Sequence, residues 1–450
     1  MTTTPARGYE PKPCLGNCQQ VSSTLISCGS ALDVACDMTT RFPAHSIFAA
    51  SALLFAPALQ VMAQPSGADW PQLLGPERNL TYRGPWSTKS SFASVWKKEV
   101  GEGFSAPVVS QGRLLIFHRQ NNREILDALD PATGKQQWSA AYPTAYRDDF
   151  GFSEGPRATP TVDGDLVFTY GAEGTLQCVN LKTGARVWQL DARKEFGVRK
   201  EFFGTGCSPL IEGGRLLMNI GGAAGAGIVA LDKLTGKTLW KALTHESGYS
   251  SPIAATIEGA RHALFFTREG LVDADPATGR IRFEQRWRAR MAASVNAAVP
   301  VVVGDEVFVS ASYGTGASLW KIHGDKATQI WSGDESLSNH YSTSVVKDGY
   351  LYGFHGRQEM GQELRCVEWK TGKVKWSVPD LRAGTVTLAG THLFVLKEDG
   401  ELLIAPADPT RFQPVKTVKV ARPVVRAYPA LAGGRLYVRT DSELSAWRVD

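Results

Sequence analysis

The sequence predicts an all-β protein, and more narrowly an eight-bladed β-propeller built from four-stranded blades. Two observations lead to this prediction. The 450 residues include 45 glycines and 10% aromatic residues, a composition that suits many short strands joined by tight turns. An aromatic residue, nearly always Trp, also occupies one position of a repeat at intervals of 43 to 52 residues. Self-similarity at a period of this length indicates stacked supersecondary units.

The repeated stretch contains a Thr-Gly turn. It reads LDPATGKQQWS from Leu129, VNLKTGARVWQ from Val179 and ALDKLTGKTLWK from Ala230. An Asp or Asn side chain before such a turn accepts hydrogen bonds from the turn amides, and Gly supplies a left-handed backbone conformation. The aromatic residue that follows belongs to an outer strand, where we expect its ring to be buried against the next unit. This docking role is predicted for Trp96, Trp138, Trp188, Trp240, Trp331 and Trp376, with Phe283 in the same position.

Each unit reads as four strands in order. The first begins near a Pro, as in SAPVV and ATPTV, and a Gly-centred turn leads to the second, as in SQGRLLIFH. The third is short and alternating, as in LDALD, and the turn described above leads to the fourth. Strand, Gly turn and strand is the signature of a β-hairpin. Eight units are expected to start at Ala106, Ala158, Cys207, Ser251, Ala298, Thr343, about Gly384 and Tyr428.

The eighth unit lacks a fourth strand of its own, because the sequence ends at Asp450 directly after ELSAWRVD. The stretch SFASVWKKEV around Trp96 is predicted to supply it from the N-terminal side. Closure of this kind joins the two ends of the propeller and removes open sheet edges. The propeller is therefore expected over residues 92–450, with an N-terminal extension over residues 64–91.

Residues 38–63 are typical of a secretory signal peptide. They contain one Arg, a short apolar run and a final Ala63 near which cleavage is expected. The apolar run is short and interrupted by Pro57, so we expect no transmembrane segment in the mature chain. A buried N-terminal helix is the alternative interpretation. Residues 1–37 are interpreted as an over-extended, disordered start, because Met38 is a second plausible initiator.

Charge and cysteine content narrow the functional classes. The formal net charge is +5, and the basic residues are scattered rather than clustered, so nucleic-acid binding is not predicted. Only Cys178, Cys207 and Cys366 follow the apolar run, and a sparse, odd set argues against a disulfide framework. The first and last of these occupy a third-strand position that is Ala in other units, which predicts small core residues. No metal site is predicted.

The pattern A-x-D-x-x-T-G-x-x-x-W resembles the tryptophan-docking repeat of the quinoprotein-dehydrogenase-like, or PQQ-repeat, β-propellers over about residues 92–450. That superfamily includes PQQ-dependent alcohol dehydrogenases and the non-enzymatic assembly factor BamB. In the dehydrogenases the quinone lies between a Trp and a disulfide of adjacent cysteines, with Ca²⁺ held by Glu and Asn and an Asp as base. This chain has no adjacent Cys pair, so no catalytic or cofactor residue is carried over. PQQ with Ca²⁺ stays possible, because other quinoproteins lack the disulfide. BamB-like scaffolds are lipoproteins, whereas no lipidation Cys follows the apolar run.

Non-repeating segments carry the candidate site, because binding residues are common on loops held by a rigid scaffold. Three such segments precede first strands, at residues 146–160, 193–209 and 336–344. Residues just before each first strand are expected to surround one mouth of the central channel, where polar groups converge on a ligand. The candidates are Arg157, Tyr249, Asn296, Asn339, His340 and Arg426. The alternative for each is that it caps a strand end. His118 and His355 lie in similar stretches, IFHRQ and GFHGRQ, which suggests a shared structural role.

These observations favour binding over catalysis. We expect an exported, periplasmic or extracellular monomer that acts as a binding or scaffolding module for a protein or polymer. A PQQ-dependent dehydrogenase for an alcohol or a sugar is the alternative, and a carbohydrate-binding propeller, suggested by aromatic-rich loops, is the third possibility.

Overall fold

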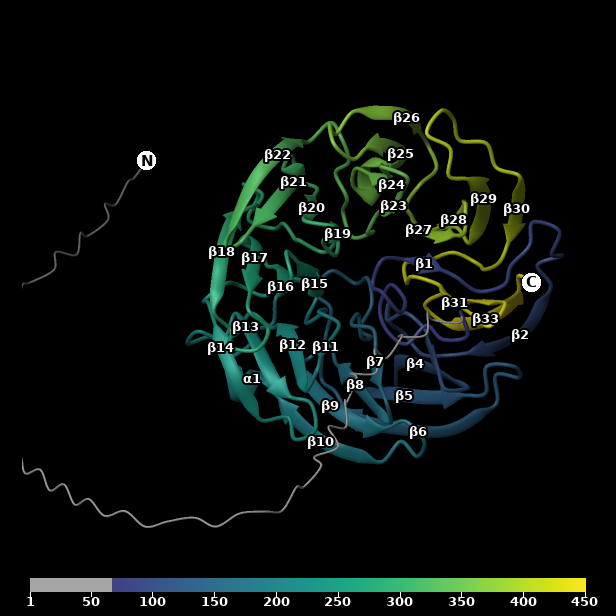
Figure 1. The fold of residues 1–450 in the computed structure, drawn as a ribbon. Coiled ribbons are helices and arrows are strands. Elements are labelled where there is room, and N and C mark those ends of the chain that lie inside the picture. The colour runs from purple at the N-terminus through teal and green to yellow at the C-terminus, as the bar shows by residue number, and fades with distance from the viewer. Residues whose placement is uncertain (1–66) are drawn as a thin grey trace, which may run out of the picture. The chain divides into compact units, whose positions relative to one another are not determined.

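Eight β-sheets are arranged around a common axis in the computed structural model, which describes residues 67–450 (Figure 1). Seven of the sheets described have four strands and one has five. The eight-bladed propeller predicted from the repeat is confirmed. The expected start segment 1–37 and signal peptide 38–63 lie outside the described residues.

The first four blades follow the order of the chain. Blade 1 contains β3 (Val108–Ser110), β4 (Arg113–Gln120), β5 (Arg123–Leu129) and β6 (Gln136–Pro143). Blade 2 contains β7 (Thr161–Asp163), β8 (Leu166–Tyr170), β9 (Thr175–Asn180) and β10 (Arg186–Asp191). Blade 3 contains β11 (Leu210–Glu212), β12 (Arg215–Asn219), β13 (Ile228–Asp232) and β14 (Thr238–Ala242). Blade 4 contains β15 (Ile253–Ile257), β16 (Ala260–Phe266), β17 (Gly270–Ala274) and β18 (Ile281–Arg286).

The remaining blades include two strands from the N-terminal side. Blade 5 contains β19 (Val301–Val303), β20 (Glu306–Ala311), β21 (Gly316–His323) and β22 (Lys326–Gly333). Blade 6 contains β23 (Val345–Lys347), β24 (Tyr350–His355), β25 (Glu363–Glu368) and β26 (Val374–Val378). Blade 7 contains β27 (Gly384–Ala389), β28 (His392–Lys397), β29 (Glu401–Pro406), β30 (Lys416–Lys419) and β1 (Thr81–Tyr82). Blade 8 contains β31 (Ala430–Ala432), β32 (Arg435–Arg439), β33 (Glu443–Arg448) and β2 (Ser94–Glu99).

Helix is scarce in the described part of the chain. It consists of α1 (Ala192–Phe196) and the 3-10 turn η1 (Gln358–Met360). The Asp191 side chain caps the start of α1 by accepting a hydrogen bond from the Arg193 amide. Between residues 67 and 450 there is no helix with the length and apolar character needed to cross a membrane.

Ring closure occurs where the sequence predicted it. β2 pairs antiparallel with β33, and Trp96 lies opposite Ala446. The same opposition recurs in other blades, where a small third-strand residue faces the outer Trp; Cys178 faces Trp188, for example. Cys178 and Cys366 are buried and unpaired, which confirms their interpretation as small core residues.

Each of the six predicted docking tryptophans contacts the next blade. The indole nitrogens donate hydrogen bonds of 2.8 to 3.1 Å to backbone carbonyls of Pro131, Leu181, Lys233, Pro276, Trp369 and Asp408. The Trp188 ring lies against Gly236, where a Cβ would come within 2.8 Å of the ring. This Gly has a φ of 71°, as the left-handed turn requires. The energetic value of these contacts stays a prediction.

One inter-blade contact does not repeat. Glu124 of blade 1 is fully buried, and its Oε1 accepts a 2.7 Å hydrogen bond from the Ala172 amide of blade 2. Its second oxygen is next to the Tyr142 hydroxyl and against Gly171. Burial raises the pKa of Glu124 to about 7, because desolvation disfavours the charged form.

Residues 67–83, which we call the plug, pack against the innermost strands of several blades. Trp70 exchanges two backbone hydrogen bonds with Val109 in blade 1 (2.7 and 3.0 Å), and the Val162 amide in blade 2 donates to Pro71. β1 runs parallel to β27, so that Thr81 lies opposite Leu388 of blade 7 (Figure 1). Part of the expected N-terminal extension is therefore packed against the propeller.

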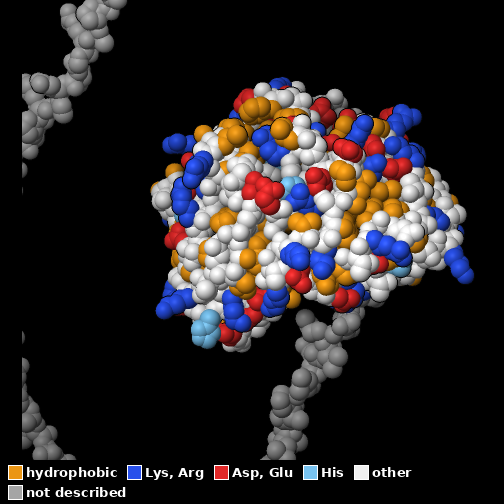
Figure 2. Space-filling model, turned by 90° about the horizontal axis from the view of Figure 1, so that it is seen from above, with side chains coloured by type: hydrophobic (Ala, Val, Ile, Leu, Met, Phe, Trp, Pro, Cys, Tyr) orange, Lys and Arg blue, Asp and Glu red, His pale blue; other side chains and the backbone are white. Residues whose placement is uncertain are grey.

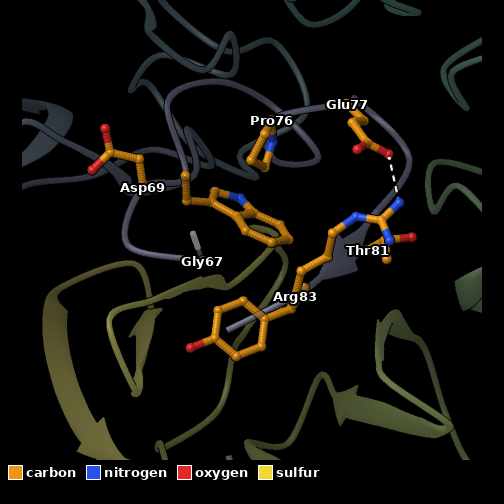
Figure 3. A pocket seen from close by; sticks show the side chains of 8 residues that line it. Gly67, Asp69, Pro76, Glu77, Thr81 and Arg83 are labelled. Atoms are coloured by element: carbon orange, nitrogen blue, oxygen red, sulfur yellow. Dashed lines mark hydrogen bonds and ion pairs between the residues drawn. The ribbon is translucent and has the colours of Figure 1, made fainter. Parts of the chain in front are cut away.

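Arg78 fixes the plug to blades 3 and 4. Its side chain is only 3% exposed and donates hydrogen bonds to the carbonyls of Pro209 and Pro252, the second at 2.9 Å. Burial lowers the pKa of this guanidinium. Figure 3 shows the neighbouring part of the plug, where the Arg83 side chain extends to Glu77 and forms a 3.2 Å ion pair.

The outer surface carries charges of both signs. Viewed at right angles to Figure 1, basic and acidic side chains are interspersed with small apolar patches (Figure 2). Many are paired locally, as in Arg280 with Asp325 at 2.6 Å. A face of this kind presents no single-sign field of the sort that steers nucleic acids.

Candidate functional site

A cavity of about 450 Å³, which we call the cup, lies among the loops at one mouth of the propeller. It is lined mainly by the loops that connect the last strand of one blade to the first strand of the next. Leu73 of the plug also lines it. The N-terminal segment therefore contributes to the lining of the cup.

Phenylalanine rings form one wall of the cup. Phe150 and Phe152 belong to the β6–β7 loop, and Phe202 and Phe203 belong to the segment between α1 and β11. The rings pack on one another, with a centroid separation of 5.1 Å between Phe150 and Phe203. Phe150 is nevertheless 53% exposed and Phe152 is 44% exposed. Large apolar side chains held together and left open to solvent are typical of a binding surface.

Arginines are interleaved with these rings. The Arg157 guanidinium lies 5.7 Å from the centre of the Phe203 ring, and that of Arg426 lies 5.3 Å from Phe152. Both are also near Phe104, at 5.8 and 5.6 Å. Guanidinium groups at these distances are attracted to aromatic faces, which orders the wall in advance of any ligand.

Each of these cations is already neutralised by a carboxylate. Arg157 pairs with the buried Asp148 at 3.3 Å, and Arg426 pairs with Glu398 at 2.5 Å. On the far side of the cup, Arg357 pairs with Glu359 at 3.3 Å and stacks on Tyr313 at 4.6 Å. The mouth is therefore rich in cations without presenting unpaired positive charge at these positions.

Polar side chains form the opposite wall. His340 is 8% exposed, and its Nε2 lies 2.8 Å from the Tyr313 hydroxyl. Burial, followed by the nearby Arg357, lowers the pKa of His340 well below its usual range. The imidazole is therefore neutral near pH 7, and its other nitrogen makes no hydrogen bond. Gln358 and Tyr341 lie on the same wall.

Comparison with known proteins places the chain in a family. Residues 121–378 match the family model described as outer membrane protein assembly factor BamB, which is more than half of the chain. The chain belongs to this family. It is a PQQ-repeat propeller, as the recurring Trp pattern suggested.

Individual relatives include both branches of the superfamily. A stretch of 108 residues is 32% identical to the quinoprotein alcohol dehydrogenase PedH of Pseudomonas putida, covering 23% of this chain and 17% of that protein. Among solved structures, BamB from Moraxella catarrhalis aligns with a TM-score of 0.58 at 15% identity, over 79% of this chain and 97% of that one. The quinohemoprotein alcohol dehydrogenase from Comamonas testosteroni aligns with a TM-score of 0.62 at 13% identity, over 86% and 81%. At these identities the likeness shows the fold alone.

The residues of this BamB-family propeller do not fit a PQQ–Ca²⁺ site. Calcium requires several oxygen ligands converging on one point. From residue 67 to residue 450, no group of three His, Cys, Asp or Glu side chains is placed to hold a metal ion. At the mouth itself, Asp148 and Glu398 are bound by arginines. Cys207 is a buried free thiol that accepts a hydrogen bond from the Asn219 amide, and burial raises its pKa to about 12.

Four of the six sequence-predicted site residues line the cup: Arg157, Tyr249, His340 and Arg426. Their role in binding stays a prediction. Asn296 and Asn339 do not reach the lining and lie behind it, which corrects the expected convergence. The Asn296 amide donates to the Thr267 and Trp287 carbonyls (2.8 and 3.0 Å), and the Asn339 amide donates to Phe354 (2.9 Å). These amides hold loops in place, because buried backbone carbonyls need donors.

Other lining residues were missed at the sequence level. The phenylalanines lie within the segments singled out above, but nothing in their local pattern marked them individually. Arg357 and Gln358 belong to the β24–β25 connection, which contains η1 and reaches the mouth. Its length, greater than that of the corresponding turn at Asn121, is the signal that could have identified it.

The two similar histidines share a structural role. His118 Nδ1 accepts a 3.0 Å hydrogen bond from the Gly101 amide, and His355 Nδ1 accepts one of the same length from the Ser338 amide. In both cases the side chain satisfies the backbone of an adjacent loop.

Proposed function

We propose that this BamB-family chain is a binding module that receives a ligand in the cup. The observation that carries the proposal is the combination of a cavity of about 450 Å³ with exposed phenylalanines in its lining. Concave, mostly apolar sites with a few convergent polar groups are the usual form of a ligand pocket.

The charge arrangement supports binding rather than catalysis. A general acid or base needs a titratable group whose pKa lies near the working pH. In the cup, the carboxylates are held by arginines and the lowered pKa of His340 keeps its imidazole uncharged. These groups position one another, and the rings between them provide the contact surface.

The second candidate function is oxidation of an alcohol or a sugar with PQQ. It is favoured by the match to PedH. That match spans about a sixth of the dehydrogenase, and the poor fit of the donor set to Ca²⁺ counts against it. No adjacent cysteines are present in the sequence to form the disulfide described above for the dehydrogenases.

We further propose that the protein is exported and works in the periplasm or outside the cell as a monomer, with a protein or polymer partner. The signal-like pattern at residues 38–63 supports export. A partner is consistent with membership of a family described by a membrane-protein assembly factor.

The neutral apolar dye Nile red tests the proposal. We expect saturable fluorescence enhancement with the native protein and about tenfold weaker binding after Phe203→Ala, because each lost ring removes a large apolar contact. Val187→Ala is the matched control, because Val187 is an exposed apolar residue on the outer strand β10. Equal loss in both variants, or no binding at all, would contradict a binding role for the cup.

The dehydrogenase alternative is tested in the same preparation. Addition of PQQ and Ca²⁺ should leave the melting temperature unchanged and give no dye-linked alcohol oxidation. A saturable rise in melting temperature together with turnover would favour the enzyme instead.

A further inference from the structure

A second cavity, which we call the basic pocket, lies beside the cup. It has a volume of about 170 Å³ and shares no lining residue with the cup. Its walls come from the β6–β7 connection, the β8–β9 turn and the segment between α1 and β11 together with α1 itself. Tyr146 belongs to its lining, and the Tyr146 ring lies 5.8 Å from the Arg157 guanidinium of the cup. The two cavities are therefore neighbours.

Cationic side chains dominate the basic pocket. Its lining contains a single carboxylate, Glu173, and four cations: Arg147, Arg193, Arg199 and Lys200. All four cationic residues are exposed, so their charged groups are accessible to a ligand from solvent. A concave site lined mainly by one sign of charge attracts ligands of the opposite sign. The composition of the lining therefore favours an anion.

The one carboxylate of the lining holds the walls together. Glu173 Oε2 accepts hydrogen bonds from the Thr144 hydroxyl (3.1 Å) and the Ala145 amide (2.8 Å) of the β6–β7 connection. Its Oε1 accepts a 2.6 Å hydrogen bond from Arg193 of α1. The three walls are thus joined to one another before a ligand arrives, which reduces the entropic cost of binding.

The other three cations have unused hydrogen-bond donors. Among residues 67–450, Arg199 forms no ion pair and its guanidinium donates no hydrogen bond. Arg147 makes its side-chain hydrogen bonds through Nη1 alone. Lys200 donates to Asp149 at 2.6 Å, which leaves the rest of its N–H groups without a partner. These residues can therefore donate to the oxygen atoms of a ligand.

The existing ion pairs of these cations can yield to a ligand. Glu154 pairs with Arg147 at 3.2 Å and with Arg119 at the same distance, so it keeps a cation if Arg147 turns to an anion. The Lys200–Asp149 pair is on the surface, where ion pairs contribute little. In the cup, by contrast, one arginine pairs with a fully buried carboxylate. The basic pocket is therefore the better place for an anionic ligand.

The number of donors favours a phosphate group over a carboxylate. A phosphate monoester carries a charge of about −1.5 to −2 at pH 7 and has three strong acceptor oxygens. A carboxylate has a smaller charge and fewer oxygens. Arg147 and Arg199 belong to different loops, so they can bind different oxygens of one group. Guanidinium groups bind phosphate through paired N–H donors.

We propose that the basic pocket binds a phosphate group, either as the free ion or as a monoester on a larger molecule. Arg147 and Arg199 donate to the phosphate oxygens, and Lys200 neutralises part of the charge. Arg193 remains paired with Glu173 and keeps the walls in place. The site is separate from the cup, so this proposal does not depend on the ligand of the cup.

Isothermal titration calorimetry of the full chain tests the proposal. The titrations are made at low ionic strength, because salt screens exposed charges. The ligands are inorganic phosphate, glycerol 3-phosphate and acetate. We expect saturable binding of phosphate or its monoester and roughly tenfold weaker binding of acetate, which offers less charge and fewer acceptors. The tighter of the two phosphate compounds identifies the source as free or esterified.

Two charge-matched variants separate a site from general attraction. Arg199→Gln removes a cation of the lining, whereas Lys194→Gln removes one from a side chain of α1 that is 86% exposed and lies outside the lining. We expect phosphate affinity to decrease about tenfold in the first, because a charge-assisted hydrogen bond is lost. The second should stay within about twofold of the native protein. Both melting temperatures should be unchanged, because both side chains are exposed.

The remaining outcomes would overturn the proposal. Equal effects of the two variants would mean that phosphate responds to overall charge rather than to a site. Acetate binding as tight as that of phosphate would contradict a phosphate site, and so would the absence of saturable phosphate binding. Nile red affinity should be the same in both variants, because neither residue lines the cup. The dye therefore reports separately on the proposed function.

Discussion

The outer strands and the channel mouth of this propeller use aromatic residues in opposite ways. On the outer strands the same contact is made again and again: an indole donates to a carbonyl of the next blade and covers its turn Gly, as Trp188 does with Lys233 and Gly236. At the mouth, Phe150 and Phe152 lie in a connecting loop outside the repeated strands and remain exposed. The aromatic residues that recur in the repeat therefore hold neighbouring blades together, whereas those outside the repeat lie in the candidate site.

The largest effect is expected at the outer strands. Trp188→Ala should lower the free energy of unfolding by about 3–4 kcal/mol, because it removes a large ring and its hydrogen bond from a blade interface. Urea denaturation measures this. The neighbouring Val187→Ala should cost less than about 0.5 kcal/mol. Nile red affinity should be the same in both folded variants; a change confined to Trp188→Ala would mean that outer strand and mouth are coupled.

Glu124 makes a contact that does not repeat, but it lies outside the cup. Its substitution therefore shows whether a non-repeating residue can serve stability alone. The folded state keeps this carboxyl protonated up to about pH 7, whereas the unfolded chain loses the proton near its ordinary pKa of 4.5. Its contribution is therefore most favourable below pH 4.5 and declines as the pH rises through 7. Relative to the native protein, Glu124→Gln should gain about 2–3 kcal/mol between pH 4.5 and pH 8.

Urea unfolding at both pH values measures this gain. Parallel pH dependence of the two proteins would contradict a raised pKa for Glu124. Unchanged Nile red binding by Glu124→Gln would show that this non-repeating contact serves stability, whereas the non-repeating phenylalanines of the cup serve binding.

Gly236→Ala changes the residue against which the Trp188 ring packs. The residue has a φ of 71°, and a Cβ would meet the Trp188 ring. We expect a loss of about 1–2 kcal/mol. Gly259→Ala has a similar φ of 80° but open space around the position, so it reports the backbone cost alone. Thermal unfolding of the pair should show the larger loss at Gly236, and equal losses would mean that the ring contact contributes nothing.

The smallest effect on stability is expected at the mouth. Phe152→Ala should change the free energy of unfolding by less than about 0.5 kcal/mol, because the ring is 44% exposed. Nile red affinity should nevertheless decrease several-fold. If this variant were as unstable as Trp188→Ala, the phenylalanines of the mouth would contribute to stability as the outer-strand tryptophans do, and the proposed contrast would be wrong.

The repeat made most of the fold predictable because its information is local. A turn residue, a small third-strand residue and an outer Trp recur within one unit, so period and strand order follow from neighbouring positions. Even closure by β2 could be inferred, because one unit lacked a strand that was present elsewhere. Cys178 was interpretable for the same reason: its counterparts in other units are Ala.

The plug and the cup were less predictable because their contacts join distant residues. Nothing near Arg78 in the sequence indicates that its partners are the carbonyls of Pro209 and Pro252. Asn296 and Asn339 had positions suited to the mouth, yet whether a loop amide faces the cavity or the backbone depends on the path of its own loop. The phenylalanine wall arises only when loops from several blades meet.

The pairing of β2 with β33 also constrains when the protein can fold. Lys97 and Glu443, which form a 3.0 Å ion pair across this seam, are 346 positions apart in the chain. During synthesis from the N-terminus, the first outer strand must wait unpaired until residue 448 has been made. The waiting strand is short and carries three charged residues, Lys97, Lys98 and Glu99, which discourage pairing with the wrong chain. The seam thus makes completion of the ring a late event, which must follow synthesis of β33.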